Sequence, residues 1–414
     1  MKLTPRAAAV ASALSSVCAF AQTAPAAADI RPQSTTLPEV IVTATKPVDK
    51  LGLDEARSSA SRLPMTPRDT PASVFVIGRD AIELRGHLNT QEILSGAPGL
   101  SFAAPPGSAG SVVYRGFGAG QLTQLFNGIT VQYDAIAARP VDSWIYDRVE
   151  VIGGPSTFLF GAGAVGGSIN TITKTPQREA DFIDGLLSYG SFNSSNLAFG
   201  INRRLSGADG GMRNTARLDL NRSASDGYAD GSRRVATNLA TSLLTDFNSR
   251  WSHTLALEYQ REEVDRPYWG TPLLNPTGGD GRIDPGTRFK NYNSADGIYE
   301  QTVKWARSIT EYRASEATSL RNTLYHYDAL RDYRNVEVYR FTPDNLRVTR
   351  SSPLLQRHDQ TLIGNRVEIN HKATLFGRPA DWAFGLDYSV NKQTRFPRSL
   401  TLNVSTVDPY DFST

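Results

Sequence analysis

The feature that most constrains this chain is an alternation of apolar and polar side chains that begins at about residue 178. It runs through segments of roughly ten residues separated by polar turns. Over 254–259, leucine and tyrosine at odd positions alternate with threonine, alanine and glutamate, and 382–388 repeats the pattern. A period of two predicts β-strands with one apolar and one polar face. Such strands build either a half-buried soluble sheet or a transmembrane barrel whose apolar face meets lipid.

Several observations favour the barrel. No helical periodicity interrupts the strands, and short turns at 190–193 and 248–249 contrast with a long connection at 264–296, as in outer-membrane barrels. No run of about 18 apolar residues exists, which excludes membrane-spanning helices. Aromatic residues near the expected strand ends are typical of interfacial girdles: Tyr189, Phe192, Trp251, Tyr259, Trp382 and Tyr388. A secreted β-sandwich is the alternative.

Residues 1–21 have the form of a secretory signal peptide. Lys2 and Arg6 precede an apolar, small-residue stretch, Ala7–Phe20, and residues 19–21 match an A-x-A cleavage pattern. The alternative is a buried alanine-rich helix. The single cysteine, Cys18, lies inside this segment, so the processed chain is expected to contain none. That composition suits an oxidising compartment outside the cytoplasm.

Residues 22–63 are expected to form a flexible leader, because 22–36 is rich in alanine, proline and threonine. Within the leader, Leu37–Thr45 reads LPEVIVTAT, a β-prone run without a partner strand nearby in sequence. An isolated extended segment on a tether is suited to pairing with the sheet edge of another protein. The alternative is that this run forms the first strand of the next domain.

Residues 64–177 have the pattern of a compact α/β domain. SVFVIGR at 73–79 predicts a strand, and 79–99 has the apolar spacing of a helix that ends near Gly96 and Pro98. β-Branched runs between turn residues follow, such as VVYRGF, RVEVIGG and GSINTITK.

Several strings resemble the TonB-dependent outer-membrane receptors and, within them, the ferric-siderophore receptors. LPEVIVTAT resembles a TonB box, and TPASVFVI, LSGAPGLSF and YRGFGAGQLTQLFNGI resemble successive parts of the plug domain. The strongest match, DRVEVIGGPSTFLFGAGAVGGSINTITKTP at 147–176, resembles the end of the plug and its hand-over to the first barrel strand. The matches follow the family's order. Two positions depart from it: Asn127-Gly128 stands where Asp-Gly is usual, and Gly153 where a basic or polar residue is usual.

The resemblance implies a transmembrane antiparallel β-barrel of about 22 strands with an N-terminal α/β plug domain inside the lumen. Here 64–177 would be the plug and 178–414 a partial barrel of about ten strands. About 22 strands of about 9–11 residues each would need more chain than this. The sequence would therefore hold about half of the barrel, as the N-terminal portion of a receptor. A truncated, non-functional receptor is an alternative.

By the same resemblance, the protein would bind a ferric siderophore and import it across the outer membrane of a Gram-negative bacterium. TonB and its inner-membrane energy-transducing partners would supply the energy, and outer-membrane lipid would surround the barrel. Iron would arrive already chelated, so no enzyme activity, cofactor, protein metal ligand or catalytic residue is expected. Cobalamin, haem and oligosaccharide receptors are alternatives within the family. A passive porin and a secreted adhesin are alternatives outside it.

The resemblance also assigns residues to roles. The TonB-binding segment would comprise Glu39, Val40, Ile41, Val42, Thr43 and Ala44. Aromatic rings and a guanidinium suit a large, often anionic chelate, and the ligand-binding candidates are Arg115, Gly120, Gln121, Tyr133, Tyr268 and Trp269. Packing of the plug would depend on Arg115, Gly116, Phe117, Glu150, Gly154, Pro155, Gly161, Gly166, Gly167 and Asn170, where glycine permits close backbone approach.

Other motifs have weaker support. Residues 161–166 match G-x-G-x-x-G, but a strand pattern follows where a dinucleotide site needs a helix. The net charge of +3, from 44 basic and 41 acidic residues, is too balanced for a nucleic-acid binder. Glu262, Glu263 and Asp265 could form an acid/base pair, but a solvated rim beside a loop is the favoured interpretation.

The leader generates a testable prediction. Because strand addition depends on main-chain hydrogen bonds, Val42→Pro should abolish energised uptake while leaving ligand binding intact. Transport and equilibrium binding of the same radiolabelled ligand, measured side by side on cells, check this. Loss of binding in the variant would refute the coupling role of Leu37–Thr45.

Overall fold

The computed structural model describes residues that all lie within one compact unit, Lys50–Thr414. The described residues are 66, 70, 72–102, 112–131, 141–155, 165–206, 211–276, 281–396, 400 and 402–414. The predicted signal peptide, the leader with its TonB box, Tyr133 and Gly161 lie outside them. No helix in these ranges has the length and hydropathy needed to cross a membrane.

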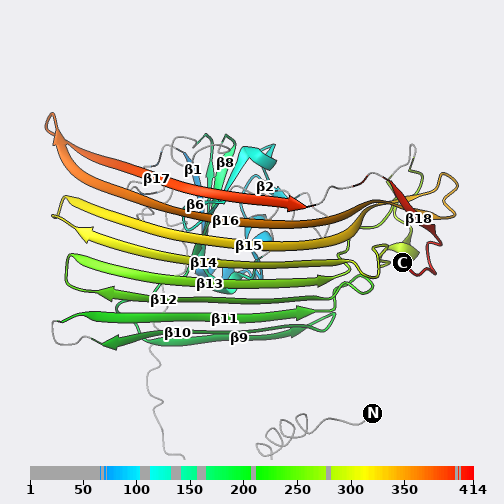
Figure 1. Ribbon diagram of the computed structural model, residues 1–414, viewed down its shortest axis with the longest axis horizontal. Helices are drawn as coiled ribbons and strands as arrows, with labels where there is room; N and C mark the ends of the chain where they lie inside the picture. The colour runs from blue at the N-terminus through cyan, green and yellow to red at the C-terminus, as the bar shows by residue number, and fades with distance from the viewer. Residues whose placement is uncertain are drawn as a thin grey trace, which may run out of the picture. The chain divides into compact units, whose positions relative to one another are not determined.

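The larger sheet is an antiparallel meander in which each strand from β9 to β17 pairs with the next one in sequence, and β18 pairs with β16 (Figure 1). Its strands are β9 (Phe182–Gly190), β10 (Ser194–Ser206), β11 (Arg213–Ser225), β12 (Arg234–Asp246), β13 (Trp251–Asp265), β14 (Ile298–Arg313), β15 (Thr318–Phe341), β16 (Val348–Leu375), β17 (Arg378–Phe396) and β18 (Asn403–Val407). We call this sheet the wall.

Strands β17 and β18 both pair with β16, at successive positions along it. β17 pairs with residues 357–375 of β16, and β18 pairs with 348–351 in the same antiparallel sense. The ten strands match the number expected from the alternating segments. In the described residues, β9 and β17 are the two ends of the sheet and do not pair with each other, so the wall is an open part of a barrel.

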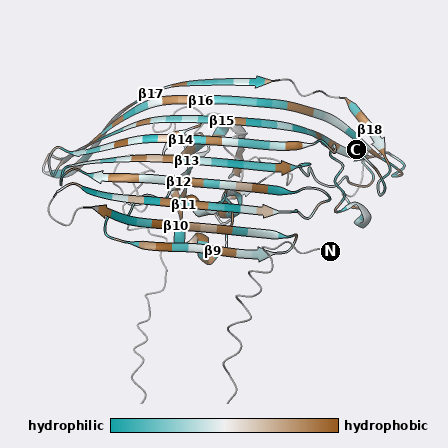
Figure 2. Cartoon of the chain, turned by 60° about the horizontal axis from the view of Figure 1, so that its bottom comes forward, coloured by the Kyte–Doolittle hydropathy of each residue, from teal (hydrophilic) through white to brown (hydrophobic). Residues whose placement is uncertain are grey.

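In the strands of the wall, apolar side chains are exposed and polar side chains are buried, which is the reverse of a soluble sheet. In β13, Leu255 and Leu257 are 45% and 46% exposed, whereas Glu258 and Gln260 are 6% and 1% exposed. Figure 2 shows hydrophobic and hydrophilic residues alternating along the strands. A secreted sandwich would bury the leucines, so this pattern identifies a barrel wall with an apolar outer face and a polar inner face.

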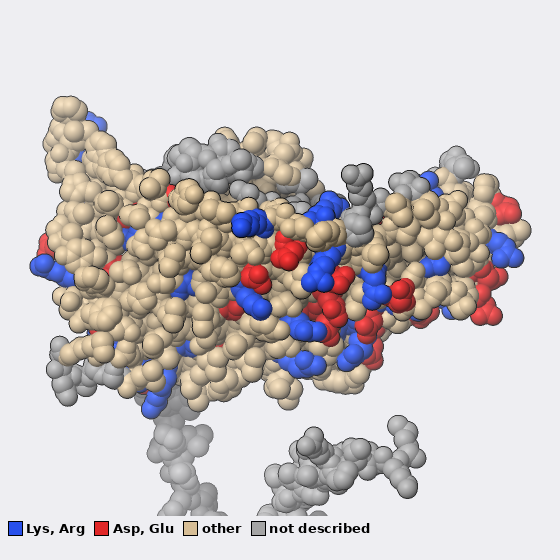
Figure 3. Space-filling view, in the orientation of Figure 1, with Lys and Arg blue, Asp and Glu red and all other residues tan. Residues whose placement is uncertain are grey.

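The outer face changes from apolar to charged along the strands. One register row across β13–β17 carries only apolar or aromatic side chains: Trp251, Tyr312, Leu320, Ile369 and Phe384. A row nearer the long 266–297 connection carries only charged side chains across β13–β16: Glu263, Glu300, Asp332 and Arg357. Figure 3 shows charged side chains gathered mostly towards the β18 end of the sheet.

This change locates the lipid-facing part of the wall. At 24 and 28 residues, β15 and β16 are much longer than the about 9–11 residues that span a membrane. Trp251 contacts Phe247 and Tyr312 edge-on, with ring centroids 6.4 and 5.7 Å away, at the end with short turns. Such a cluster is typical of an interfacial girdle. The strands therefore extend beyond lipid at the end that carries the 266–297 loop.

The smaller domain, the plug, contains two sheets and two short helices. One sheet has the order β1-β7-β8-β5-β6, with β5 and β8 parallel; its strands are Ser73–Gly78, Tyr146–Gly153, Gly167–Thr173, Leu122–Phe126 and Ile129–Thr130. The other joins β2 (Leu100–Phe102), β3 (Val112–Tyr114) and β4 (Phe117–Gly118). Two 3-10 turns, η1 (Ala119–Gln121) and η2 (Ser143–Ile145), precede β5 and β7.

The helical segment expected over 79–99 is two helices, α2 (Arg79–Leu84) and α3 (Thr90–Ser95). Gly86 has a φ of 66°, which ends α2. Asn89 then caps α3, because its side chain accepts a hydrogen bond from the Glu92 amide at 3.0 Å. Ile82, Ile93 and Leu94 still reach one core with the plug sheet, so the apolar spacing was informative although the helix is interrupted.

The two zones of the outer face predict different tolerance to charge. Leu257→Arg should destabilise the folded barrel by about 2–4 kcal/mol, because it places a charge in the lipid-facing zone. Leu355→Arg is the matched control, since Leu355 is also exposed but lies in β16 next to the charged row. Urea unfolding in lipid vesicles measures both. Equal losses would contradict the assigned membrane position.

Candidate functional site

The plug contacts the inner face of the wall through polar groups, and one contact centres on Lys174. The Lys174 ammonium lies 3.0 Å from Asp219 Oδ1 of β11 and 4.1 Å from the centre of the Trp144 ring. Trp144 Nε1 donates to the Phe199 carbonyl of β10 at 3.1 Å. Burial lowers the pKa of Lys174, and Asp219 opposes that shift. This end of the plug therefore depends on a carboxylate from the wall.

A second group of contacts lies beside it. Thr173 Oγ1 donates to Glu258 Oε1 at 2.8 Å, and Glu258 forms an ion pair with Arg307 of β14. Ser223 Oγ of β11 donates to Asp142 Oδ2 at 2.7 Å. Burial raises the pKa of the Asp142 carboxyl. The hydrogen bonds thus join plug residues to strands β10, β11 and β13.

The third contact involves the Asn127-Gly128 turn and β16. Arg366 Nη1 donates to the Gly128 carbonyl at 2.8 Å, while its Nε binds Asp387 Oδ2 of β17 at 2.8 Å. Asn127 and Gly128 have φ values of 52° and 78°, which asparagine and glycine tolerate well. Asn127 also bonds Thr173 through its amide, at 2.9 and 3.0 Å. These bonds account for asparagine at this departure from the family pattern.

Two buried apolar clusters reinforce the polar contacts. In one, Trp144 and Ile145 of the plug pack with Ala198 and Ala240 of the wall. In the other, Phe126 of the plug joins Trp305, Tyr327 and Leu362 on the inner face of the wall. Hydrogen bonds between plug and wall exchange for bonds to water at a net cost of about 1 kcal/mol each. The plug can therefore stay bound to the wall and still separate from it one hydrogen bond at a time.

The plug candidates Arg115, Gly116 and Phe117 lie in one tight hairpin. Tyr114 pairs with Phe117, and the two residues between them have φ values of 50° and 86°. Arg115 stacks on Tyr114 with 5.0 Å from its Cζ to the ring centre, and its Nη1 donates to Ser73 Oγ at 3.4 Å. The exposed guanidinium forms no salt bridge with another described residue.

Gly120 and Gln121 lie near this hairpin, at the start of β5. Gln121 accepts the Gly166 amide through its carbonyl at 2.9 Å, and its side chain accepts the Gly118 amide at 3.3 Å. Both Gly120 and Gln121 are exposed. Within the described residues, no hydrogen bond, ion pair or ring contact joins Arg115, Gly120 or Gln121 to the wall.

The predicted plug glycines lie where backbone approaches closely. A Cβ on Gly166 would meet Phe117 Cβ at 2.3 Å, and one on Gly167 would meet the Ile152 carbonyl at 2.4 Å. Gly154, before Pro155, has a φ of 95°. Position 153 is glycine, where the family usually has a basic or polar residue, because Tyr114 occupies the space that a side chain would need. A Cβ at Gly153 would lie 2.6 Å from the tyrosine oxygen.

Glu150 and Asn170 face each other across β7 and β8 in the plug sheet. They are register partners, and both are buried. Glu150 Oε1 accepts from Arg148 Nε at 2.7 Å, whereas Asn170 Oδ1 accepts from the Gly128 amide at 2.9 Å. Asn170 thus connects the plug sheet to the Asn127-Gly128 turn, whose Gly128 carbonyl accepts a hydrogen bond from Arg366.

Tyr268 and Trp269 belong to the 266–297 loop, which contains η3 (Pro285–Thr287). Tyr268 is buried, and its hydroxyl bonds Thr271 at 2.5 Å and the Arg288 carbonyl at 3.2 Å. Trp269 is half-buried and lies 6.4 Å from the Tyr333 ring of β15. The described contacts do not bring these two residues together with the plug candidates Arg115, Gly120 and Gln121.

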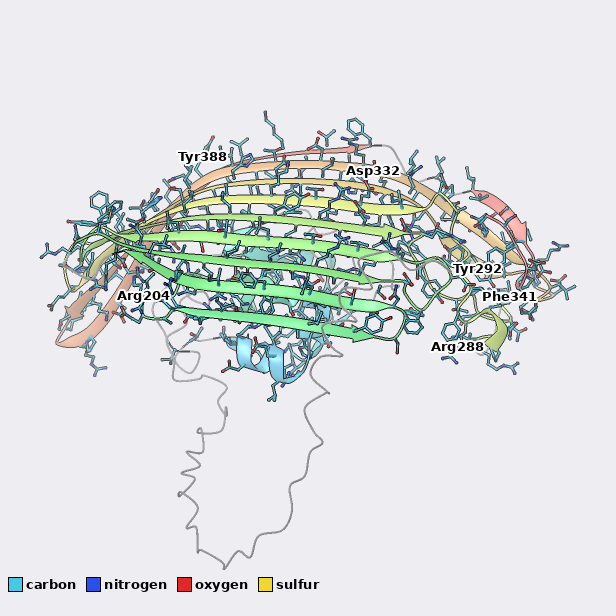
Figure 4. The ribbon with its side chains drawn as sticks, turned by 90° about the horizontal axis from the view of Figure 1, so that it is seen from below. Arg204, Arg288, Tyr292, Asp332, Phe341 and Tyr388 are labelled. Carbon is cyan, nitrogen blue, oxygen red and sulfur yellow. The ribbon has the colours of Figure 1, made fainter. Side chains whose placement is uncertain are left out.

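The loop is held by a residue that the sequence did not single out. Tyr292 is fully buried, stacks on Phe412 at 4.7 Å, and donates to the Pro409 carbonyl at 2.7 Å. Arg350 Nε donates to the Tyr292 carbonyl at 2.6 Å. Figure 4 shows Tyr292 and Phe341 at the loop end of the sheet and Arg204 at the opposite end.

The favoured solvated-rim interpretation is wrong for Glu262. Its side chain is buried on the inner face and pairs with Arg234 of β12 at 2.6 Å. Glu263 points to the outer face beside Arg261, so the two glutamates do not form an acid/base pair. In the described ranges, no three His, Cys, Asp or Glu side chains are grouped as metal ligands would be.

The comparisons with known proteins agree with this geometry. Residues 66–168 match the family model of the TonB-dependent receptor plug domain. The chain carries a TonB-dependent receptor plug domain. The match covers Phe126, Gly128 and Trp144, which contact the inner face of the wall, and ends before Thr173 and Lys174.

Among curated relatives, the ferripyoverdine receptor of Pseudomonas aeruginosa is 35% identical over 133 residues, covering 30% of this chain and 15% of that protein. The probable TonB-dependent siderophore receptor PiuA of Acinetobacter baumannii is 24% identical over 307 residues, covering 72% and 39%. The vitamin B12 transporter BtuB of Vibrio vulnificus is 32% identical over 123 residues, covering 29% and 20%.

Solved structures extend the similarity to the wall. The crystal structure of PiuA has a TM-score of 0.72 at 20% identity, covering 83% of this chain and 49% of that one. The ferric-catecholate import receptor Fiu of Escherichia coli, in its open form, has a TM-score of 0.74 at 20% identity, covering 87% and 55%. At this identity the likeness concerns the fold. The chain spans less than two thirds of each of these relatives.

The Lys174 contact predicts a stability effect. Asp219→Asn leaves both the buried Lys174 ammonium and the buried Arg217 guanidinium without their shared carboxylate, and should cost about 3–5 kcal/mol. Glu179→Gln is the matched control, because Glu179 is exposed and lies 3.8 Å from Arg213. Thermal unfolding in detergent and protease cleavage of the plug compare them. If both variants shift the midpoint equally, the pair does not hold the plug.

Proposed function

We propose that this chain serves in an outer-membrane receptor that imports a ferric siderophore into the periplasm, using energy transmitted by TonB. The observation that carries the proposal is a plug domain attached by separable polar contacts to the inner face of a lipid-facing barrel wall. Relatives named as siderophore receptors support the choice of ligand. The protein acts as a carrier and not as an enzyme, and its location is the outer membrane of a Gram-negative bacterium.

The proposed mechanism follows from the contacts of the plug. The plug obstructs the lumen of a barrel that would otherwise be an open pore. TonB, with its inner-membrane partners, pairs with the extended segment Glu39–Ala44 and pulls on the leader. Lys174–Asp219, Thr173–Glu258 and Gly128–Arg366 then separate one after another, and water takes over each hydrogen bond. The ligand passes once these contacts have opened.

We assign ligand contacts to residues of the plug and of the 266–297 loop. Plug candidates are Arg115, Gly120, Gln121 and Tyr133, and loop candidates are Tyr268 and Trp269. Exposure of the Arg115 guanidinium and partial exposure of Trp269 support a role for both. Tyr268 acts indirectly, because its hydroxyl is engaged inside the loop. Iron enters as the siderophore chelate, so the protein provides no iron ligand and needs no cofactor.

Cobalamin is the second candidate ligand. The similarity of 123 residues of this chain to a vitamin B12 transporter is the specific observation in its favour. Both candidates use the same plug and the same coupling segment, so only the ligand distinguishes them.

Growth tests decide between the ligands. A strain that lacks the gene, starved of iron and fed one purified ferric siderophore at a time, should fail to grow on the cognate compound. Returning the gene should restore growth, and a gene that carries Val42→Pro should not. Normal growth of the deletion strain on every siderophore, together with loss of cobalamin-dependent growth, would favour cobalamin.

A further inference from the structure

Arg331, on the inner face of β15, is a buried cation without a hydrogen-bonded partner. Its side chain is 6% exposed, and its Nε–H has no acceptor. In the described ranges, no carboxylate forms an ion pair with it. The guanidinium lies over the rings of Tyr333 and Tyr299, 4.6 and 5.4 Å from their centres. A guanidinium has five N–H donors, and burying it without acceptors is costly.

Two further basic residues continue the row across the sheet. His358 of β16 is the register partner of Arg331, and Arg395 of β17 is the register partner of His358. We call these three residues the basic row. Glu337, at an irregularity in β15, is the acid that interacts with both arginines. Among the described residues, this one carboxylate faces two guanidinium groups, so the described part of the row has an excess of positive charge.

The basic row lies nearer the long loop than the plug contacts of Phe126 and Gly128, and in the same register row as Ser223, which bonds Asp142 of the plug. Phe126 of the plug packs against Tyr327, and Gly128 bonds Arg366, which pairs in register with Thr323. Arg331 comes later along β15 than either position. Trp269 of the loop reaches the same place, because its ring lies 6.4 Å from Tyr333. A ligand that enters from the loop end would meet the basic row before it met these plug contacts.

We propose that the basic row is a binding site for the anionic, iron-ligating oxygens of the chelate, and that the imported chelate carries a net negative charge. This inference rests on the proposed function and narrows its ligand class. The guanidinium fork of Arg331 matches paired anionic oxygens. The half-buried ring of Trp269 suits aromatic chelating rings such as catecholates. An uncharged chelate would leave the excess positive charge unbalanced.

Binding titrations test this inference on the receptor purified from outer membranes of cells that carry its gene. The probes are an anionic ferric tris-catecholate and an uncharged ferric tris-hydroxamate. The receptor should prefer the tris-catecholate, and Arg331→Gln should weaken its binding about tenfold or more. Arg334→Gln is the matched control, because Arg334 lies on the same strand, points to the outer face and has a side chain 45% exposed. It should bind as the wild type does.

A folding defect would also lower binding, so a variant of opposite sign separates the two causes. Glu337→Gln removes the acid that competes for the basic row, and should raise affinity for the tris-catecholate about two- to fivefold. A damaged wall cannot produce that gain.

The outcomes distinguish this inference from the proposed function. Preference for the tris-hydroxamate, equal effects of Arg331→Gln and Arg334→Gln, or no gain with Glu337→Gln would overturn the anionic ligand class and leave siderophore import standing. Failure to bind any ferric siderophore, with normal iron-limited growth of the deletion strain, would remove the proposed function and this inference together.

Discussion

Every strand of the wall must place neighbouring side chains in opposite environments, and the rest of the structure depends on that constraint. The side chains of Leu255 and Leu257 face outwards, whereas Glu258 and Gln260 are buried on the inner face. Lipid offers no hydrogen bonds, so the polar set can only face inwards. Once inside, these groups need partners, and a domain within the lumen can supply them. The plug is therefore a chemical complement of the wall as well as an obstruction.

The complement is polar and distributed along the strands. Lys174, Thr173 and the Gly128 carbonyl each contact a different part of the wall, and two apolar clusters, around Phe126 and around Trp144, add to these contacts. Hydrophobic packing of the same extent would resist separation in proportion to its whole area. Discrete hydrogen bonds can be exchanged for water one at a time. An interface of this kind suits a plug that must stay in place until a partner pulls it.

The pattern of alternation predicted the wall well, because a period of two is a local property of the strand. It also predicted which residues share a face over 254–259. Prediction was weaker where one residue breaks a pattern. Gly86 and Asn89 divide the expected helix into two, although Ile82, Ile93 and Leu94 still reach the core. The prediction of a solvated rim was wrong for Glu262, because the burial of its side chain depends on Arg234. Arg234 lies 28 positions away in sequence and contacts Glu262 only across the sheet.

The sequence by itself determined the strands, their faces and the plug, since these follow from side-chain spacing and from motifs that are local in the chain. Only the tertiary structure decided which polar groups become partners. It paired Lys174 with Asp219, filled the space at Gly153 with Tyr114, engaged the hydroxyl of Tyr268 inside its loop, and left Arg331 buried between two tyrosines without an anion. The physical reason is that partners and burial are set by the register between strands far apart in sequence, which no local pattern encodes.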